Sequence, residues 1–330
     1  MPSVSVIVAA RNEIRNIDAC LDSLVGLEYP HESLEILVVD DESTDGTGER
    51  IAAWAARDPR IRVLSVEGTI PGLRGKANAV AQAIERAKGE IIMTTDADCT
   101  VPPGWVRETV RRYGPGTGCV CGHTLLRTDG AFSGMQALDW AYMLTIASAG
   151  VGWGFPLSAV GNNMSYRRAA YEEVGGYRGI GFSVAEDFAL FKAIGYRTGW
   201  DIRYPMSLDT AVSSEPCPDI RTIYLQKKRW GKGGVKIHPL GFAIMAIGFT
   251  TSAALLILPW IGFPMFLWII GIAVKFGADA FLLFPTLRTF KRLHLFRYFF
   301  IFELYYLIYV VLLPFIVFLT GPVTWKERRY

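Results

Sequence analysis

Two pairs of carboxylates each follow a short apolar run of the sequence. Asp40 and Asp41 end one run, and Asp96 and Asp98 end a later one. Residues two apart on an extended segment project from one face, so Asp96 and Asp98 can reach one ion. Mg²⁺ and Mn²⁺ favour carboxylate oxygens combined with substrate phosphates. The pattern indicates a divalent metal that neutralises a departing nucleoside diphosphate. Asp40 would accept hydrogen bonds from a base or ribose, although Asp is also common in turns.

A third acidic pair, Glu186 and Asp187, lies at the start of a predicted helix over residues 184–194. Ser183 followed three residues later by Glu186 matches a capping box, which gives Glu186 a structural explanation. Asp187 has no capping role in this pattern. We therefore predict that Asp187 is the general base that deprotonates an acceptor hydroxyl.

A cationic and aromatic motif follows the acidic pairs. Gln226, Arg229 and Trp230 are spaced to share one helical face. The planar guanidinium of Arg229 suits diphosphate oxygens, and Trp230 suits an apolar or sugar surface. A basic helix at a membrane surface would have a similar composition, because three lysines adjoin the motif: Lys227, Lys228 and Lys232. Both interpretations stay open.

These residues need a scaffold of alternating strands and helices. We expect strands at residues 4–9, 34–39, 61–66 and 90–95, with helical spacing between them. One helix, over residues 76–88, would end at Gly89 as its C-cap. The alternation predicts an α/β fold with a mostly parallel sheet, in which ligands bind beyond the carboxyl ends of the strands. A dinucleotide-binding domain would need a glycine-rich turn after the first strand, where this chain has Ala10, Arg11 and Glu13.

The composition divides the chain into two parts. Charged residues are 20% of the 330, and most of the acidic ones precede residue 215, whereas the last third is apolar. We expect a soluble domain over residues 1–235 and a membrane domain over 236–330. A net charge of +3 without a basic stripe does not favour nucleic-acid binding. The five cysteines have no CxxC spacing, which is typical of reduced thiols in a cytosolic domain.

Six short segments resemble family 2 glycosyltransferases of the GT-A fold. They are VSVIVAARNE (residues 4–13), VVDDESTDGT (38–47), GKANA (75–79), TDAD (95–98), AED (185–187) and QKKRW (226–230). The segment GNNMSYRR (161–168) is similar to the stretch that precedes the acidic pair in that family. The resemblance covers about residues 4–230 and implies a GT-A domain, Rossmann-like with a mostly parallel sheet, followed by transmembrane helices.

The resemblance also implies roles for individual residues. Nucleotide and donor contacts would come from Ala10, Arg11, Glu13, Asp40, Asp41, Lys76, Asp96 and Arg229. Asp98, with Asp96 nearby, would bind the Mg²⁺ or Mn²⁺, and Asp187 would be the base. The donor or acceptor sugar would meet Asn162, Asn163, Glu186, Gln226 and Trp230, although the asparagines are equally compatible with turns. The family inverts the anomeric configuration by direct displacement, so no covalent nucleophile is needed.

Three apolar segments near the C-terminus have the length of a bilayer crossing, roughly 20 residues. We expect spans at residues 240–261, 264–284 and 298–320. The second contains Lys275 and Asp279, four residues apart, which can pair inside the bundle. The third contains Glu303, which is either functional or interfacial.

The basic residues near these segments predict the orientation of the chain. The connection at residues 285–297 carries Arg288, Lys291, Arg292 and Arg297, so we expect it to be cytoplasmic, together with the soluble domain, at the inner membrane of the cell. The tail at residues 326–329 is also basic, whereas three full spans would place it outside. Either the last segment re-enters or lies in the interface, or the charge rule fails here.

These observations predict an inverting, metal-dependent hexosyltransferase of the membrane. The expected donor is a UDP-sugar and the expected acceptor is a lipid hydroxyl, as in a carotenoid, a sphingolipid-like molecule, diacylglycerol or a polyprenyl phosphate. The motif of Gln226, Arg229 and Trp230 also occurs in processive β-glycan synthases, so a polymer product is the alternative. A catalytically inactive membrane scaffold and a nucleotidyltransferase are further alternatives, and the intact set of acidic and basic residues argues against the scaffold.

Overall fold

The computed structural model describes residues 1–234, 238–322, 324–325 and 328–329. Its core is a seven-stranded sheet with the strand order β3-β2-β1-β4-β8-β6-β9. Strands β1 to β4 are parallel, whereas β8 runs antiparallel to β4 and β6. The mostly parallel α/β sheet is therefore confirmed. The strands are β1 (Val4–Ala10), β2 (Leu34–Asp40), β3 (Ile61–Ser65), β4 (Ile91–Asp96), β6 (Thr117–Cys121), β8 (Met164–Arg167) and β9 (Asp201–Arg203).

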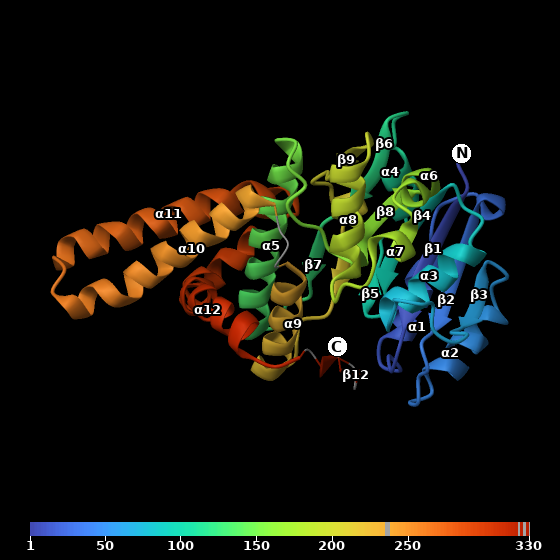
Figure 1. The fold of residues 1–330 in the computed structure, drawn as a ribbon, viewed down its shortest axis with the longest axis horizontal. Coiled ribbons are helices and arrows are strands. Elements are labelled where there is room, and N and C mark those ends of the chain that lie inside the picture. The colour runs from blue at the N-terminus through green and yellow to red at the C-terminus, as the bar shows by residue number, and fades with distance from the viewer. Residues whose placement is uncertain (235–237, 323, 326–327, 330) are drawn as a thin grey trace.

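Helices cover both faces of this sheet (Figure 1). Helices α3, α5 and α8 share a buried cluster with Ile7 of β1, whereas α1, α2 and α4 share another with Val6 and Val8. Strand β1 is apolar except for Ser5, because its side chains alternate between two buried faces. The helices of this domain are α1 (Ile17–Val25), α2 (Thr47–Ala55), α3 (Lys76–Arg86), α4 (Trp105–Val110), α5 (Ala131–Gly152), α6 (Arg168–Glu173), α7 (Gly176–Ile180), α8 (Glu186–Arg197) and α9 (Ile220–Gly233).

A second, smaller sheet begins directly after the second acidic pair. Its strands are β5 (Cys99–Thr100), β10 (Val212–Ser214) and β7 (Thr124–Leu126), with β10 in the middle. Strand β10 is antiparallel to β5 and parallel to β7. Two short 3-10 turns, η2 (Gly161–Asn163) and η3 (Leu208–Thr210), lead into β8 and β10. A third sheet pairs β11 (Thr324–Trp325) with β12 (Arg328–Arg329).

In the described part of the chain, three helical segments are long and apolar enough to cross a membrane: Pro239–Ile261, Met265–Thr289 and Leu293–Leu319. They comprise α10 (Pro239–Ile257) with turn η5 (Leu258–Ile261), α11 (Met265–Thr289), and turn η6 (Leu293–Tyr298) with α12 (Phe299–Leu319). Figure 1 shows α10 and α11 as a hairpin that projects from the rest of the molecule, whereas α12 lies beside α5 and α9.

Both ends of α12 contact helices of the α/β domain. At its start, Tyr298 lies so close to Gly134 of α5 that a Cβ on the glycine would come within 2.1 Å of its ring. At its end, Lys232 of α9 donates hydrogen bonds to the carbonyls of Thr320, at 3.1 Å, and Gly321, at 2.7 Å. Both ends of α12 are therefore held against the α/β domain.

A charged cluster lies between α11 and α12. Lys275 forms ion pairs with Asp279, at 2.7 Å, and with Glu303. Tyr142 of α5 donates a hydrogen bond to Asp279 at 3.0 Å. The predicted pairing of Lys275 with Asp279 is confirmed. Glu303 is fully buried in this cluster, so it does not lie at an interface with water.

The structure corrects several local predictions. Helix α3 ends at Arg86 with Ala87 as its C-cap, and Gly89 is instead required because a Cβ there would lie 2.4 Å from the backbone of Ser5. The connection at 285–297 is not a loop, because α11 continues through Pro285 to Thr289 and η6 follows. The domain boundary at residues 235–236, like part of the basic tail at 326–327, falls outside the described residues.

Candidate active site

The carboxyl ends of neighbouring strands bring the first two acidic pairs together. In the register of the sheet, Ala10 lies beside Asp40, and Ala9 lies beside Asp96. Asp40 and Asp96 therefore flank the end of β1, which is where ligands bind in open α/β sheets. Asp41 is buried, and its N–H donates to the carbonyl of Ala10 at 2.8 Å. The sequence spacing alone predicted this meeting of the two pairs.

The loop after β1 and the loop after β2 form one hydrogen-bonded unit. Arg11 donates from Nη1 to the carbonyl of Asp41 at 2.7 Å. The N–H of Glu13 donates to Thr47 Oγ1 at 2.9 Å, at the start of α2. These bonds hold Arg11 and Glu13, which were predicted to contact the nucleotide, in a fixed position relative to the end of β2.

The carboxylate of Asp40 is held at the sheet edge by its surroundings. Its Oδ1 accepts a hydrogen bond from the N–H of Ser43 at 3.1 Å. Gly48, in the first turn of α2, leaves room for the other oxygen, because a Cβ there would come within 2.8 Å of Asp40 Oδ2. This arrangement keeps Asp40 in one orientation, as an acceptor for base or ribose would require.

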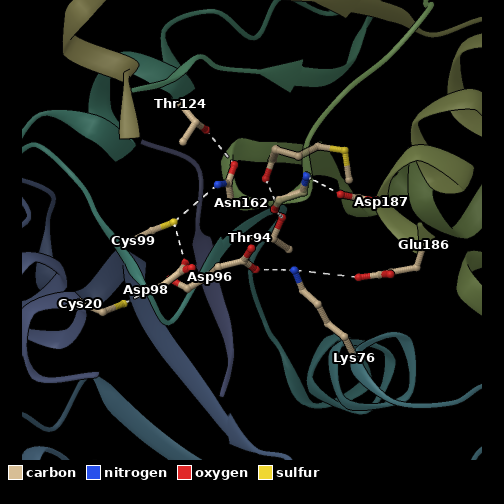
Figure 2. A network of polar contacts seen from close by, with 12 residues as sticks. Cys20, Lys76, Thr94, Asp96, Asp98, Cys99, Thr124, Asn162, Glu186 and Asp187 are labelled. Atoms are coloured by element: carbon tan, nitrogen blue, oxygen red, sulfur yellow. Dashed lines mark hydrogen bonds and ion pairs between the residues drawn. The ribbon is translucent and has the colours of Figure 1, made fainter. Parts of the chain in front are cut away.

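Lys76 connects the acidic pair of β4 with the acidic pair of α8 (Figure 2). Its Nζ forms an ion pair with Asp96 and lies 3.9 Å from Glu186 Oε1. Burial alone would lower the pKa of Lys76, but the carboxylates of Asp96, Glu186 and Asp187 raise it above its ordinary value. Lys76 is therefore a permanent positive charge among three carboxylates, which is suited to an incoming diphosphate.

Glu186 and Asp187 share the start of α8 but differ in environment. Burial raises the pKa of Glu186 to about 7, and the charge of Asp187 acts in the same direction, whereas Lys76 and Arg229 oppose it. The predicted capping box does not form, because the N-cap residue Ala185 makes no side-chain cap. Glu186 is thus turned toward Lys76 and is not used to cap the helix.

Helix α9 packs directly against this end of α8. A Cβ at Gly233 would lie 2.5 Å from the Cβ of Ala185, the residue before Glu186. This close approach brings Arg229 near enough to lower the pKa of Glu186. The predicted donor residue Arg229 therefore joins Lys76 in the same electrostatic environment, although the two are 153 positions apart in the sequence.

Asp187 is oriented by two backbone N–H groups. Its Oδ2 accepts a hydrogen bond from Gly161 at 2.5 Å, and its Oδ1 accepts one from Phe188 at 2.8 Å. Thr94 of β4 donates to the carbonyls of Gly161, at 2.7 Å, and Met164, at 3.1 Å, and so fixes η2 to the sheet (Figure 2). The sequence analysis missed Thr94; a hydroxyl two residues before Asp96 on a buried strand was the available signal.

Asp98 begins a chain of polar contacts that ends at η2 (Figure 2). The thiol of Cys99 donates to Asp98 Oδ1 at 3.2 Å, and Asn162 Nδ2 donates to the Cys99 sulfur at 3.6 Å. Thr124 donates to Asn162 Oδ1 at 2.7 Å. Burial, followed by the charges of Asp98 and Asp96, raises the pKa of Cys99, so it remains a thiol. Asn162 is thereby placed between Asp98 and Asp187.

The hydrogen bonds of Asn163 give it a structural role in the fold. Its Nδ2 donates to the carbonyls of His123, at 2.8 Å, and Thr210, at 2.9 Å. Its Oδ1 accepts from the indole of Trp105 at 3.0 Å. The side chain is buried and ties α4 and η3 to η2. Of the two asparagines, Asn162 is thus the one placed beside the acidic residues.

Helix α9, which carries Gln226, Arg229 and Trp230, packs against α5 and is therefore not fully exposed. Lys227 is buried and forms an ion pair with Asp139 of α5 at 2.5 Å. Trp230 meets Trp140 edge to face, with ring centroids 5.2 Å apart. Lys228 is also buried, whereas Gln226 is partly exposed. The sequence analysis missed Asp139, whose signal was a lone acid in an apolar helix.

The acidic residues suit a hard cation only when a ligand supplies further oxygens. No group of three or more potential metal ligands occurs among the residues that the structure describes. Asp96 and Asp98 offer carboxylate oxygens, but Asp96 is paired with Lys76. This donor set suits the coordination preference of Mg²⁺, which is bound by one or two carboxylates together with substrate phosphates.

Comparison with known proteins identifies the family. Residues 5–175 match the profile of glycosyl transferase family 2, and residues 91–321 match that of glycosyl transferase family group 2. The chain belongs to glycosyltransferase family 2. The predicted family is therefore confirmed.

Two relatives represent different products within this family. The chain is 29% identical over 245 residues to a β-monoglucosyldiacylglycerol synthase of Nostoc sp., covering 71% of this chain and 49% of that protein. It is 25% identical over 240 residues to a poly-β-1,6-N-acetyl-D-glucosamine synthase of Staphylococcus epidermidis, covering 71% and 55%. The chain thus spans about half the length of these curated relatives.

A solved structure shows the same fold. It is the mannosyltransferase PcManGT from Pyrobaculum calidifontis in complex with GDP-Man and Mn²⁺. The TM-score is 0.59 at 23% identity, over 93% of this chain and 87% of that structure. The similarity extends beyond the α/β domain, because the covered share is larger than that domain alone. The GT-A assignment is confirmed.

Proposed function

We propose that this glycosyltransferase transfers a hexose from a nucleoside diphosphate sugar, of the UDP type, to the hydroxyl of a membrane lipid with inversion of the anomeric configuration. The observation that carries the proposal is the meeting of Asp40, Asp96, Lys76 and Asp187 at one edge of the sheet. The apolar helices and the lipid acceptor named for the Nostoc relative support the choice of acceptor.

The reaction is a single displacement. Asp187, oriented by Gly161, takes the proton of the acceptor hydroxyl. The hydroxyl oxygen then forms a bond to the anomeric carbon, while the bond from that carbon to the β-phosphate oxygen breaks. Lys76 and Arg229 supply positive charge beside the departing diphosphate. Asp98 and Asp96 would hold a Mg²⁺ or Mn²⁺, which when bound neutralises further charge on the leaving group.

Nucleoside diphosphate release by membranes that contain the chain tests this proposal. UDP-glucose, UDP-galactose and GDP-mannose are offered with Mg²⁺ or Mn²⁺, with and without a lipid extract, beside the Asp187→Asn variant. We expect lipid-dependent release that is lost in Asp187→Asn, together with a labelled lipid. A variant as active as the wild type, or no release with any donor, would overturn the mechanism.

A processive polysaccharide synthase is the second candidate, since the Staphylococcus relative is named for a polymer product. Both candidates use the same base and donor site, so only the product separates them. One sugar per labelled lipid supports the lipid glycosyltransferase. A product of high mass that resists lipid extraction supports the synthase.

We further propose an inner-membrane protein in which the hairpin of α10 and α11 crosses the bilayer, with the α/β domain on the cytoplasmic side. Helix α12 has the length for a third span, but its two ends contact α5 and α9 of the α/β domain. Both ends of α12 would therefore lie on the cytoplasmic side of the membrane. The basic tail would then share the cytoplasmic side with the connection after α11, which removes the conflict in the charge pattern.

A further inference from the structure

A cavity lies on the opposite side of the small sheet from the active-site residues. Thr100, Ser213 and Leu125 are paired across β5, β10 and β7, and all three line it. Their neighbours Cys99 and Ser214 face the other way, because side chains alternate along a strand. Cys99 contacts Asp98 and Asn162. The two sides of one short sheet thus serve two different sites.

This cavity has a volume of about 540 Å³ and a basic wall. Lys291, Arg292 and His294 form that wall, and the hydroxyls of Thr100, Thr128 and Ser213 add hydrogen-bonding groups. No acidic side chain is among the residues that line it. None of the three basic residues forms an ion pair with a carboxylate in the described part of the chain. The cavity therefore offers positive charge to a ligand.

The basic residues are held in place by the fold. Arg292 is partly buried, and its Nη1 donates to the carbonyl of Leu126 at 2.6 Å. Burial lowers the pKa of Arg292 from its ordinary value, with no carboxylate to offset it. Lys291 has a positive φ of 56°, which a non-glycine residue adopts rarely and at a cost. The guanidinium of Arg292 is thus held in place before any ligand binds, and the backbone at Lys291 has a defined conformation.

The place of the cavity in the chain indicates its ligand. Residues 290–292 directly follow Met265–Thr289, the second helix of the hairpin proposed to cross the bilayer. The ends of such helices lie at the level of the lipid headgroups, where phosphate groups are concentrated and attract basic residues. A cavity of this volume can enclose a phosphate with part of its glycerol.

We propose that this cavity binds the phosphate group of an anionic phospholipid headgroup. Binding there would hold the α/β domain against the membrane surface and would brace the strand that follows Asp98. The site is separate from the sugar-transfer site and does not depend on the proposed reaction. Free inorganic phosphate shares the chemistry, and the experiment distinguishes the two sources.

The test uses the full chain purified in a neutral detergent. Native mass spectrometry measures binding of phosphatidylglycerol, phosphatidylcholine and inorganic phosphate. The site variant is Lys291→Asn, which removes one positive charge from the cavity wall, and Asn tolerates the left-handed backbone at this position. The control variant is Arg288→Gln, which also removes one positive charge from the same connection but none from the cavity wall.

We expect wild type and control to bind phosphatidylglycerol alike and more tightly than phosphatidylcholine. The site variant should bind it about tenfold more weakly, which corresponds to about 1.4 kcal/mol, because it loses one charge-assisted contact with the phosphate. Tight binding of inorganic phosphate alone would assign the site to a soluble anion and overturn the lipid proposal. Equal loss in both variants would show general attraction to the basic surface and would also overturn it. If Lys291→Asn does not fold, His294→Gln is the second variant; it removes another donor from the cavity wall and should likewise weaken binding of phosphatidylglycerol, and unchanged binding would overturn the proposal.

Discussion

The carboxylate of Asp187 accepts a hydrogen bond from the backbone N–H of Gly161 at 2.5 Å, and no other residue type could occupy position 161 without moving it. A Cβ there would lie 2.6 Å from both the Cβ and Oδ2 of Asp187. The side chain proposed as the base is therefore positioned by a turn 26 residues earlier in the chain. Thr94 holds that turn to β4, so the base and the acidic residues of β4 belong to one rigid unit.

Gly161→Ala should reduce turnover without unfolding the protein. Displacement of the base by about 1 Å can cost about 100-fold in rate, and Asp187→Asn, which removes the base, should cost about 100- to 10,000-fold. Initial rates of nucleoside diphosphate release measure both. Gly152→Ala is the control, because a Cβ there meets nothing within 4 Å. Full activity in Gly161→Ala would contradict the positioning role.

The second prediction concerns the pH dependence that Glu186 confers. Its pKa is raised to about 7, so Glu186 is neutral below that pH and negatively charged above it. If the charged form holds Lys76 in place, kcat/KM should rise with pH through about 7 and then level off. In Glu186→Gln the side chain is neutral at every pH, so this rise should disappear. A variant that keeps the same rise would assign it to another group.

The third prediction concerns the buried ion pair between Asp139 and Lys227. Asp139→Ala leaves the ammonium of Lys227 buried without its partner, which should lower the free energy of unfolding by about 3–5 kcal/mol. Thermal unfolding in detergent measures the loss. Replacing both residues, as Asp139→Leu with Lys227→Met, should restore most of the stability, because no unpaired charge remains buried.

A matched control for this pair lies on the same helix. Asp219 caps α9 by accepting a hydrogen bond from the N–H of Thr222 at 2.7 Å, and it is exposed. Asp219→Ala should cost about 1 kcal/mol, as is usual for an N-cap. If Asp139→Ala were no more harmful than Asp219→Ala, the pair would not anchor α9 to α5.

The sequence alone was sufficient to predict those contacts that are set by the regular geometry of strands and helices. The meeting of Asp40 and Asp96 was predicted because parallel strands end at one edge of a sheet. The pairing of Lys275 with Asp279 was predicted from a spacing of four within one helix. In both cases the geometry follows from the regular period of a strand or helix, so no knowledge of tertiary packing was needed.

The contacts that depend on packing between distant elements were not predictable in this way. The capping box proposed for Glu186 does not form because the N-cap is Ala185 and not Ser183, and Glu186 instead faces Lys76 of α3. A surface helix stayed open as one interpretation of the lysines around Lys227, because its partner Asp139 is 88 positions away. The sequence left open whether the segment of α12 crosses the membrane, because its contact with Lys232 depends on the packing of α9. Sequence periodicity carries no information about such pairings.

The last prediction concerns the side of the membrane on which α12 ends. If both ends of α12 stay with the α/β domain, a cysteine introduced by Gly321→Cys should be cytoplasmic, whereas Trp260→Cys, at the exposed tip of the α10–α11 hairpin, should lie outside. A membrane-impermeant maleimide applied to intact cells should label Trp260→Cys only, and Gly321→Cys should react after the cells are permeabilised. The wild-type chain gives the background from its own thiols. Labelling of Gly321→Cys in intact cells would show that α12 crosses the bilayer, and that the contact between Lys232 and Thr320 does not persist in the membrane.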